Sequence, residues 1–124
     1  MLRAMIDAMI DVLSPSNFAA WRDTALPKTP LVLDVREPWE LQTASVTADG
    51  FTLLHIPMQS IPARVDELKQ QHGTDVPVAC LCHHGIRSMQ VANYLARHGF
   101  TSVVNLHGGI AAWAEQVDPH IPQY

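Results

Sequence analysis

The chain has 124 residues, of which 48% are hydrophobic and 16% charged, and its net charge is −4. This composition predicts one globular domain with a sizeable core and argues against a disordered chain. We expect neither a nucleic acid partner nor a membrane partner, because Lys and Arg form no cluster and no apolar stretch approaches the roughly 20 residues of a membrane span.

Residues 1–13 are expected to form an extension ahead of the domain. Their apolar residues recur with the period of an amphipathic helix, and a short edge strand over residues 9–13 is the alternative. Asp7 and Asp11 interrupt this apolar run, which argues against a signal peptide. Two cysteines in one short segment cannot form a structural disulfide framework. Free thiols suit a reducing compartment, so we expect a cytoplasmic protein.

Apolar strands alternate with helices along the rest of the chain. Proline follows a capping residue at Ser14-Pro15 and at Glu37-Pro38, where we expect helices to begin. The other expected elements are strands over 31–35, 51–56, 76–81 and 102–106 and helices over 16–23, 61–71, 88–98 and 110–116. Residues 43–50 are expected to form a surface loop. Near-continuous apolar strands between helices predict a parallel α/β sheet covered on both faces.

The segment Ala79-Cys-Leu-Cys-His-His-Gly-Ile-Arg-Ser88 carries the clearest chemical signal. Cys82 falls at the carboxyl end of an expected strand, where parallel sheets bind their ligands. Backbone N–H groups at the following helix start and the Arg87 guanidinium favour a thiolate and attract an anion. We therefore predict that Cys82 is a nucleophile and that residues 83–88 form an anion-binding loop.

The individual loop residues have separate expected roles. Gly85 permits a positive φ or a close backbone approach, and Ser88 is the expected N-cap of the helix, with its hydroxyl near the sulfur. His83 and His84 are expected to line the pocket mouth, where a protonated imidazole would attract an anion. Ile86 lies in the same loop and is expected to influence substrate preference.

The second cysteine has a different expected role. Cys80 lies inside an apolar strand and is predicted to be a packed core thiol, with a resolving thiol for Cys82 as the alternative. Together with His83 and His84 the two cysteines offer four metal donors. Consecutive donors cannot wrap one ion tetrahedrally, so we predict neither a metal nor a cofactor.

Four segments resemble the signature segments of the single-domain rhodanese-like sulfurtransferases. They are residues 82–88, the sequence LDVREPWE at 33–40, HIP at 55–57, and NLHGG at 105–109 with Trp113 beyond it. All four follow the order and spacing of the family. The resemblance places the rhodanese-like domain at 14–117 and leaves 118–124 as a C-terminal tail without an assigned function.

The resemblance implies a three-layer fold with about five mainly parallel strands and helices on both faces. It also implies that Cys82 takes sulfur from a small anionic donor such as thiosulfate, becomes a persulfide, and passes the sulfur to a thiol or protein acceptor. By resemblance Asp34 ties down the active loop and Arg36 assists it, and a surface ion pair is the alternative for Arg36. Gly108 and Gly109 are expected to let the last helix approach the loop closely.

Loop length separates two related chemistries. Cys82 and Arg87 are spaced as C-x4-R, whereas the related protein phosphatases use one more residue, which widens the loop for a phosphoryl group. The shorter loop favours sulfur transfer. A non-enzymatic persulfide carrier or interaction domain remains the alternative function, and a phosphatase-type relative is the weaker one.

Overall fold

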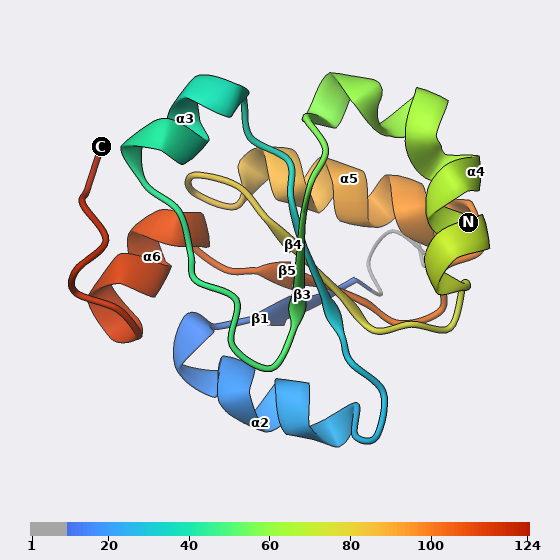
Figure 1. The fold of residues 1–124 in the computed structure, drawn as a ribbon, viewed down its shortest axis with the longest axis horizontal. Coiled ribbons are helices and arrows are strands. Elements are labelled where there is room, and N and C mark those ends of the chain that lie inside the picture. The colour runs from blue at the N-terminus through green and yellow to red at the C-terminus, as the bar shows by residue number, and fades with distance from the viewer. Residues whose placement is uncertain (1–9) are drawn as a thin grey trace.

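The computed structural model describes residues 10–124 (Figure 1). Its strands are β1 (Asp11–Leu13), β2 (Leu31–Asp34), β3 (Thr52–His55), β4 (Val78–Leu81) and β5 (Val103–Leu106). Its α-helices are α2 (Phe18–Thr24), α3 (Pro38–Thr43), α4 (Ile61–His72), α5 (Ile86–Arg97) and α6 (Gly109–Gln116), with short 3₁₀ turns η1 (Pro15–Asn17) and η2 (Met58–Ser60). Within the described residues no helix has the length and apolar character needed to cross a bilayer.

The strands form one five-stranded sheet in the order β1-β5-β4-β2-β3. Every pair of neighbouring strands is parallel, which confirms the expected sheet. Strand β4 occupies the centre, between β2 and β5, and all four of its residues are buried. The residue that follows β4 is Cys82, so the fold places this thiol at the middle of the carboxyl edge of the sheet.

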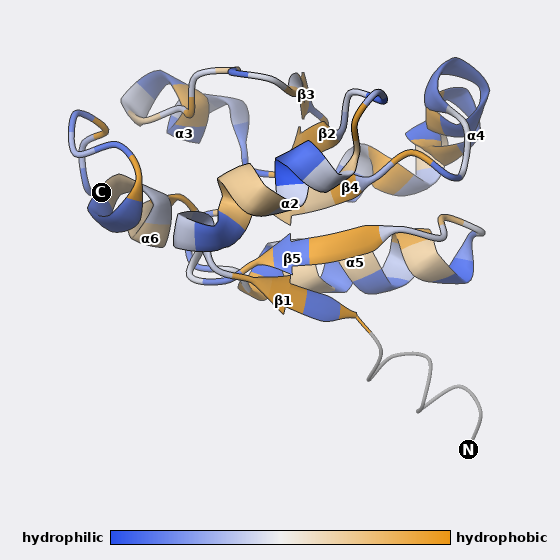
Figure 2. Ribbon diagram, turned by 90° about the horizontal axis from the view of Figure 1, so that it is seen from below, coloured by the Kyte–Doolittle hydropathy of each residue, from blue (hydrophilic) through white to orange (hydrophobic). Residues whose placement is uncertain are grey.

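Helices cover both faces of the sheet, as the sequence predicted (Figures 1 and 2). Helices α4 and α5 pack on one face, in a cluster that includes Leu33, Cys80 and Leu95. Helices α2 and α6 pack on the other face, around Phe18 and Trp113. Figure 2 shows that the strands are mostly hydrophobic while the helices also carry hydrophilic turns toward solvent. Burial on both faces explains why the strand sequences are almost continuously apolar.

Two expectations for the ends of elements need correction. The N-terminal segment contributes an edge strand, which was the alternative expected over residues 9–13, because β1 pairs with β5 from Asp11 to Leu13. The helix expected for the extension is therefore wrong at Asp11–Leu13, and its part before residue 10 lies outside the described residues. Helix α5 begins at Ile86 and its N-cap is Gly85, so the prediction of Ser88 as the N-cap is wrong. Gly85 has φ 102°, which lets the chain turn into the helix earlier than the hydroxyl residue suggested.

The loop over residues 43–50 is only partly a surface loop. Ala44 and Val46 are each 4% exposed and belong to the core on the α6 side of the sheet. Their small side chains fill space beside the sheet, which composition alone did not reveal.

Candidate active site

Cys82 lies in a nest of hydrogen-bond donors. Its Sγ accepts hydrogen bonds from the backbone N–H of Gly85 at 3.0 Å and from that of Ser88 at 3.3 Å. The Ser88 hydroxyl lies 3.2 Å from the same sulfur. The residue is 1% exposed, so these donors act in a largely dehydrated site where each has a stronger electrostatic effect. Donors from the first turn of α5 favour negative charge on the sulfur.

Asn105 fixes the loop from strand β5. Its side-chain Nδ2 donates to the carbonyl of Gly85 at 3.0 Å, and its Oδ1 accepts the Ser88 hydroxyl at 2.6 Å. A hydroxyl has one proton, so while Ser88 donates to Asn105 the Cys82 thiol is the donor in its contact with Ser88. Asn105 falls in one of the four segments that resemble the family signatures, but no local pattern indicated a role for it.

The start of helix α6 holds the other side of the loop. Ile110 N–H donates to the carbonyl of Cys82 at 2.9 Å, and Ala111 N–H donates to that of His83 at 3.2 Å. Gly109 has φ 61°, and a Cβ at this position would collide with both carbonyl groups. The close approach expected for Gly108 and Gly109 is therefore present, and it requires the missing side chain at Gly109.

Arg87 is held by an acidic residue that the sequence analysis did not single out. Its Nη1 and Nη2 donate to the two carboxylate oxygens of Glu40 at 2.7 and 2.8 Å. Glu40 is 3% exposed, and these hydrogen bonds from Arg87 lower its pKa to about 2. The same pairing raises the pKa of Arg87. Glu40 also accepts from the N–H of Glu37 at 2.9 Å, in a capping box that begins α3.

The Asp34–Arg36 pair is buried, so the alternative of a surface ion pair is wrong. Asp34 is 1% exposed and Arg36 0%, and Arg36 Nη2 lies 2.7 Å from Asp34 Oδ2. Arg36 also donates to the backbone carbonyls of Glu40 at 3.3 Å and Ala44 at 2.9 Å. These hydrogen bonds attach the Asp34–Arg36 pair to helix α3 at Glu40 and to Ala44, the residue after the helix.

The two histidines of the loop form part of a stack of rings. The His83 ring lies 3.8 Å from that of His84 and 3.8 Å from that of Tyr124, which is within 3° of parallel to it. Burial, and then charge repulsion from His84, lower the pKa of His83. This lowered pKa disfavours the protonated form of His83, which is the form expected to attract an anion. Ile86 is 73% exposed.

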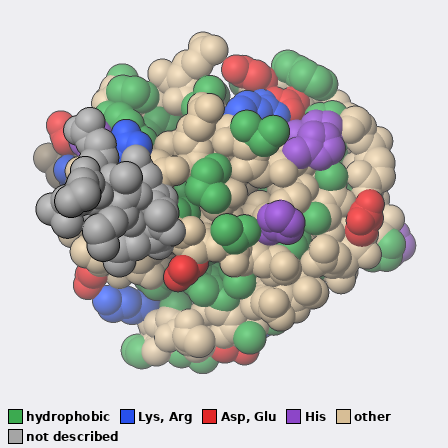
Figure 3. All heavy atoms as spheres, turned by 180° about the vertical axis from the view of Figure 1, so that it is seen from behind, with side chains coloured by type: hydrophobic (Ala, Val, Ile, Leu, Met, Phe, Trp, Pro, Cys, Tyr) green, Lys and Arg blue, Asp and Glu red, His purple; other side chains and the backbone are tan. Residues whose placement is uncertain are grey.

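Backbone N–H groups and the Arg87 guanidinium, which is paired with Glu40, are the donors that the structure brings to the loop. On the face shown in Figure 3, Lys and Arg side chains are few and scattered, and histidines lie among hydrophobic side chains. Among the described residues no group of three or more His, Cys, Asp or Glu side chains is arranged to hold a metal ion. An anion at this site would therefore meet the hydrogen-bond donors that follow β4 and not a broad basic surface.

Fold and site together define a parallel α/β domain with an amide-lined cysteine loop at the carboxyl edge of its sheet. A family model described as a rhodanese-like domain matches residues 14–116. The chain belongs to the rhodanese-like domain family, and the resemblance seen in the sequence is confirmed.

Individual relatives agree with this membership. The thiosulfate sulfurtransferase GlpE of Vibrio cholerae is 33% identical over 82 residues, which cover 66% of this chain and 70% of that protein. A rhodanese-like/PpiC domain-containing chloroplastic protein of Arabidopsis thaliana is 40% identical over 93 residues, covering 75% of this chain but 30% of that longer protein. The crystal structure of a rhodanese-related protein from Thermoplasma volcanium superposes with a TM-score of 0.70 at 26% identity, over 92% of this chain and 99% of that one. The sulfurtransferase relatives support sulfur transfer as the general activity of the domain.

Proposed function

We propose that this chain is a persulfide-forming sulfurtransferase that takes sulfur from a small anionic donor such as thiosulfate. The carrying observation is the pair of backbone N–H groups, from Gly85 and Ser88, that donate to the Cys82 sulfur. Such donors stabilise both the thiolate that attacks and the negatively charged persulfide that results. The similarity to a thiosulfate sulfurtransferase supports this choice of donor.

The first half-reaction forms the persulfide. The Cys82 thiolate attacks the outer sulfur of thiosulfate, a new S–S bond forms, and the electron pair of the old S–S bond leaves with sulfite. The Ser88 hydroxyl is within reach of the sulfur and can turn its proton toward it once the thiol has ionised. Arg87 stands at the loop with its guanidinium fixed by Glu40, where it attracts the dianion.

The second half-reaction returns the free enzyme. A thiol or protein acceptor attacks the outer persulfide sulfur, and the electron pair of the breaking bond returns to Cys82 as thiolate. A hollow of about 480 Å³ beside the loop offers an approach for the acceptor, and its lining includes His84, Ile86 and Gly108. Free thiols suit a reducing compartment, so we place the reaction in the cytoplasm.

Intact mass after incubation with thiosulfate tests the proposal. We expect a gain of one sulfur atom that cyanide removes, that Cys82→Ser lacks and that Cys80→Ser retains. Steady-state turnover with ping-pong kinetics would separate an enzyme from a non-enzymatic carrier, which forms the same adduct without rapid thiosulfate turnover. A wild-type protein that gains no sulfur from thiosulfate or polysulfide would contradict the proposal.

A further inference from the structure

Tyr124 contacts the active site although it lies beyond the region that the family model matches. Figure 1 shows the last residues of the chain, in red, running along α6 and ending beside α3. Their composition gave no sign of a function. The Tyr124 ring nevertheless stacks on His83 of the active loop. Its hydroxyl contacts two charged residues, Glu40 of α3 and Arg36, which follows β2.

The hydroxyl of Tyr124 has a fixed direction. Arg36 Nη1 lies 2.8 Å from the phenolic oxygen, and Glu40 Oε1 lies 2.9 Å from it. Arginine can only donate and an ionised carboxylate can only accept. The hydroxyl therefore accepts a hydrogen bond from Arg36 and donates its own to Glu40. It thereby connects the buried Asp34–Arg36 ion pair to the partly exposed Glu40–Arg87 ion pair.

The ring of Tyr124 is held from two sides. One face lies parallel to His83 at 3.8 Å, and the Trp39 ring stands at 81° to Tyr124 with centroids 6.1 Å apart. Ring contacts of this kind restrict the rotation of the side chain. The hydroxyl is thus presented to Glu40 by a ring that cannot easily turn away.

The Tyr124 hydroxyl provides one of the two hydrogen bonds to Oε1 of Glu40, so that each carboxylate oxygen accepts two. Oε2 accepts from Arg87 and from the N–H of Glu37, whereas Oε1 accepts from Arg87 and from Tyr124. Without the phenolic proton, Oε1 would keep only Arg87 as a partner among the described residues. The carboxylate could then rotate, and the guanidinium that it holds would move with it.

We propose that Tyr124 is a positioning residue of the sulfur-transfer site, which fixes the Glu40 carboxylate and through it the direction in which Arg87 meets an anionic donor. This inference rests on the proposed function. The contacts of Tyr124 are with Arg36, Glu40, and the rings of His83 and Trp39, and not with the Cys82 sulfur. We therefore expect its effect on sulfur transfer to pass through Glu40 and Arg87.

Steady-state kinetics with thiosulfate provide the first test. Tyr124→Phe keeps the ring and removes the hydroxyl, and we expect KM for thiosulfate to rise about fivefold with kcat changed less than about twofold, since one hydrogen bond to a charged group is lost. Arg87→Ala should raise KM further in the same direction. Tyr94→Phe is the matched control, because Tyr94 also stacks on a histidine, His98 at 3.9 Å, but lies two turns along α5 from the loop.

Alkylation of Cys82 gives a readout that does not require sulfur transfer. Iodoacetate is anionic and iodoacetamide is neutral, so the ratio of their rates reports how well Arg87 attracts a negative reagent. We expect Tyr124→Phe to lower this ratio about fivefold and Tyr94→Phe to leave it unchanged. A loss of stability alone would change both rates together, so the ratio isolates positioning.

The outcomes separate the two proposals. A wild-type protein without sulfur transfer, in which Tyr124→Phe still lowers the alkylation ratio, would overturn the proposed function and support the role of Tyr124. An unchanged ratio and an unchanged KM in Tyr124→Phe would overturn the role of Tyr124. A rise in both the ratio and kcat/KM would also overturn it, because it would show that the tail obstructs the site.

Discussion

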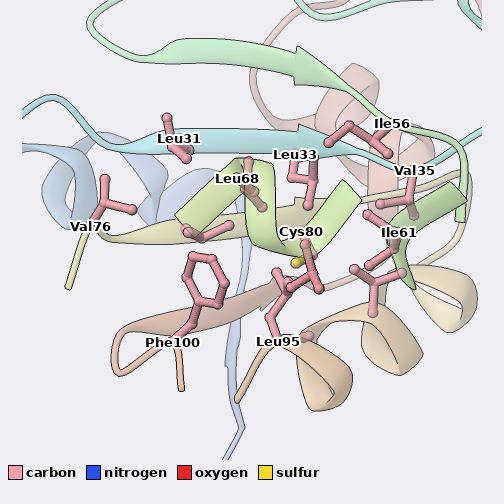
Figure 4. Packing of buried hydrophobic residues seen from close by; sticks show 14 of the residues in the cluster. Leu31, Leu33, Val35, Ile56, Ile61, Leu68, Val76, Cys80, Leu95 and Phe100 are labelled. Carbon is pink, nitrogen blue, oxygen red and sulfur yellow. The ribbon is translucent and has the colours of Figure 1, made fainter. Parts of the chain in front are cut away.

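Cys80 lies in strand β4 and Cys82 follows two residues later, directly after the strand ends, yet the surroundings of the two thiols differ. Both are buried, at 0% and 1% exposure, and both belong to the core cluster under α4 and α5. Figure 4 shows Cys80 inside that cluster, with Leu33 and Leu95 around it. Burial raises the pKa of the Cys80 thiol far above its usual range, and the charge of Cys82 adds to the effect.

The difference lies in hydrogen-bond donors rather than in exposure. At Cys80 the backbone N–H groups are used by the neighbouring strands, whereas at Cys82 the strand has ended and the turn aims two N–H groups at the sulfur. A buried thiol becomes reactive only when such donors offset the loss of water around its charged form. We therefore expect changes to the loop to alter the reactivity of Cys82, whereas Cys80 should stay unreactive in every variant.

Gly109→Ala should produce the largest effect. A Cβ here meets the carbonyls of Cys82 and His83 at positive φ, so either α6 or the loop must move. We expect a loss of about 4 kcal/mol or more in the free energy of unfolding, because backbone cannot yield as a flexible side chain can. Urea denaturation measures the loss, and the persulfide yield from thiosulfate should fall with it.

Gly99→Ala is the matched control for this variant. Gly99 also has positive φ, at 101°, but a Cβ there meets nothing within 4 Å. Only the conformational cost remains, about 1–2 kcal/mol, and persulfide formation should be normal. Equal losses in the two variants would show that the approach of α6 to the loop is not what shapes the site around Cys82.

The sequence predicted the parts of this arrangement that depend on local pattern. Apolar runs indicated the parallel strands, and Gly108-Gly109 indicated the close approach of α6. The prediction for Ser88 was wrong because a hydroxyl residue is a common N-cap, whereas the positive φ of Gly85 places the N-cap three residues earlier than expected. Local preferences thus gave the elements but not their ends.

The residues that the sequence did not reveal all act across long distances in the chain. Glu40 meets Arg87 over 47 positions, and Tyr124 meets Glu40 over 84. Glu40 lies in an ordinary capping pattern, and nothing in the composition of 118–124 marks Tyr124. Such pairs arise only when the sheet order brings α3, α5 and the tail to the same edge, so no local signal could have identified them.

Glu40→Gln should have the next largest effect, and it depends on pH. The drop of the Glu40 pKa from 4.5 to about 2 corresponds to stabilisation on the order of 3 kcal/mol. Because the folded pKa is the lower one, this stability is fully present above pH 4.5 and is lost as the pH falls toward 2. The wild type should therefore have a higher free energy of unfolding than Glu40→Gln at pH 7. This difference should disappear as the pH falls from 4.5 toward 2.

Glu67→Gln serves as the control for the pH effect. Glu67 pairs with Arg64 on α4, but the two side chains are 49% and 45% exposed, so solvent screens the pair. We expect a change below about 0.5 kcal/mol at any pH. A Glu40→Gln variant that behaved like Glu67→Gln would mean that the ion pair beside the Cys82 loop contributes no more than an exposed one.

Cys80→Ala should have the smallest effect on stability and sulfur transfer. It tests directly whether the two thiols differ in function. Removing a buried sulfur from a packed cluster should cost about 1–2 kcal/mol of unfolding free energy. Sulfur transfer should stay within about twofold of the wild type, because Cys80 has no loop donors to stabilise its thiolate and so cannot attack a persulfide on Cys82. Thiosulfate turnover and denaturation on the same preparation measure both. If transfer were lost while the fold stayed intact, Cys80 would be a resolving thiol, and donors around the sulfur would not be what distinguishes the two cysteines.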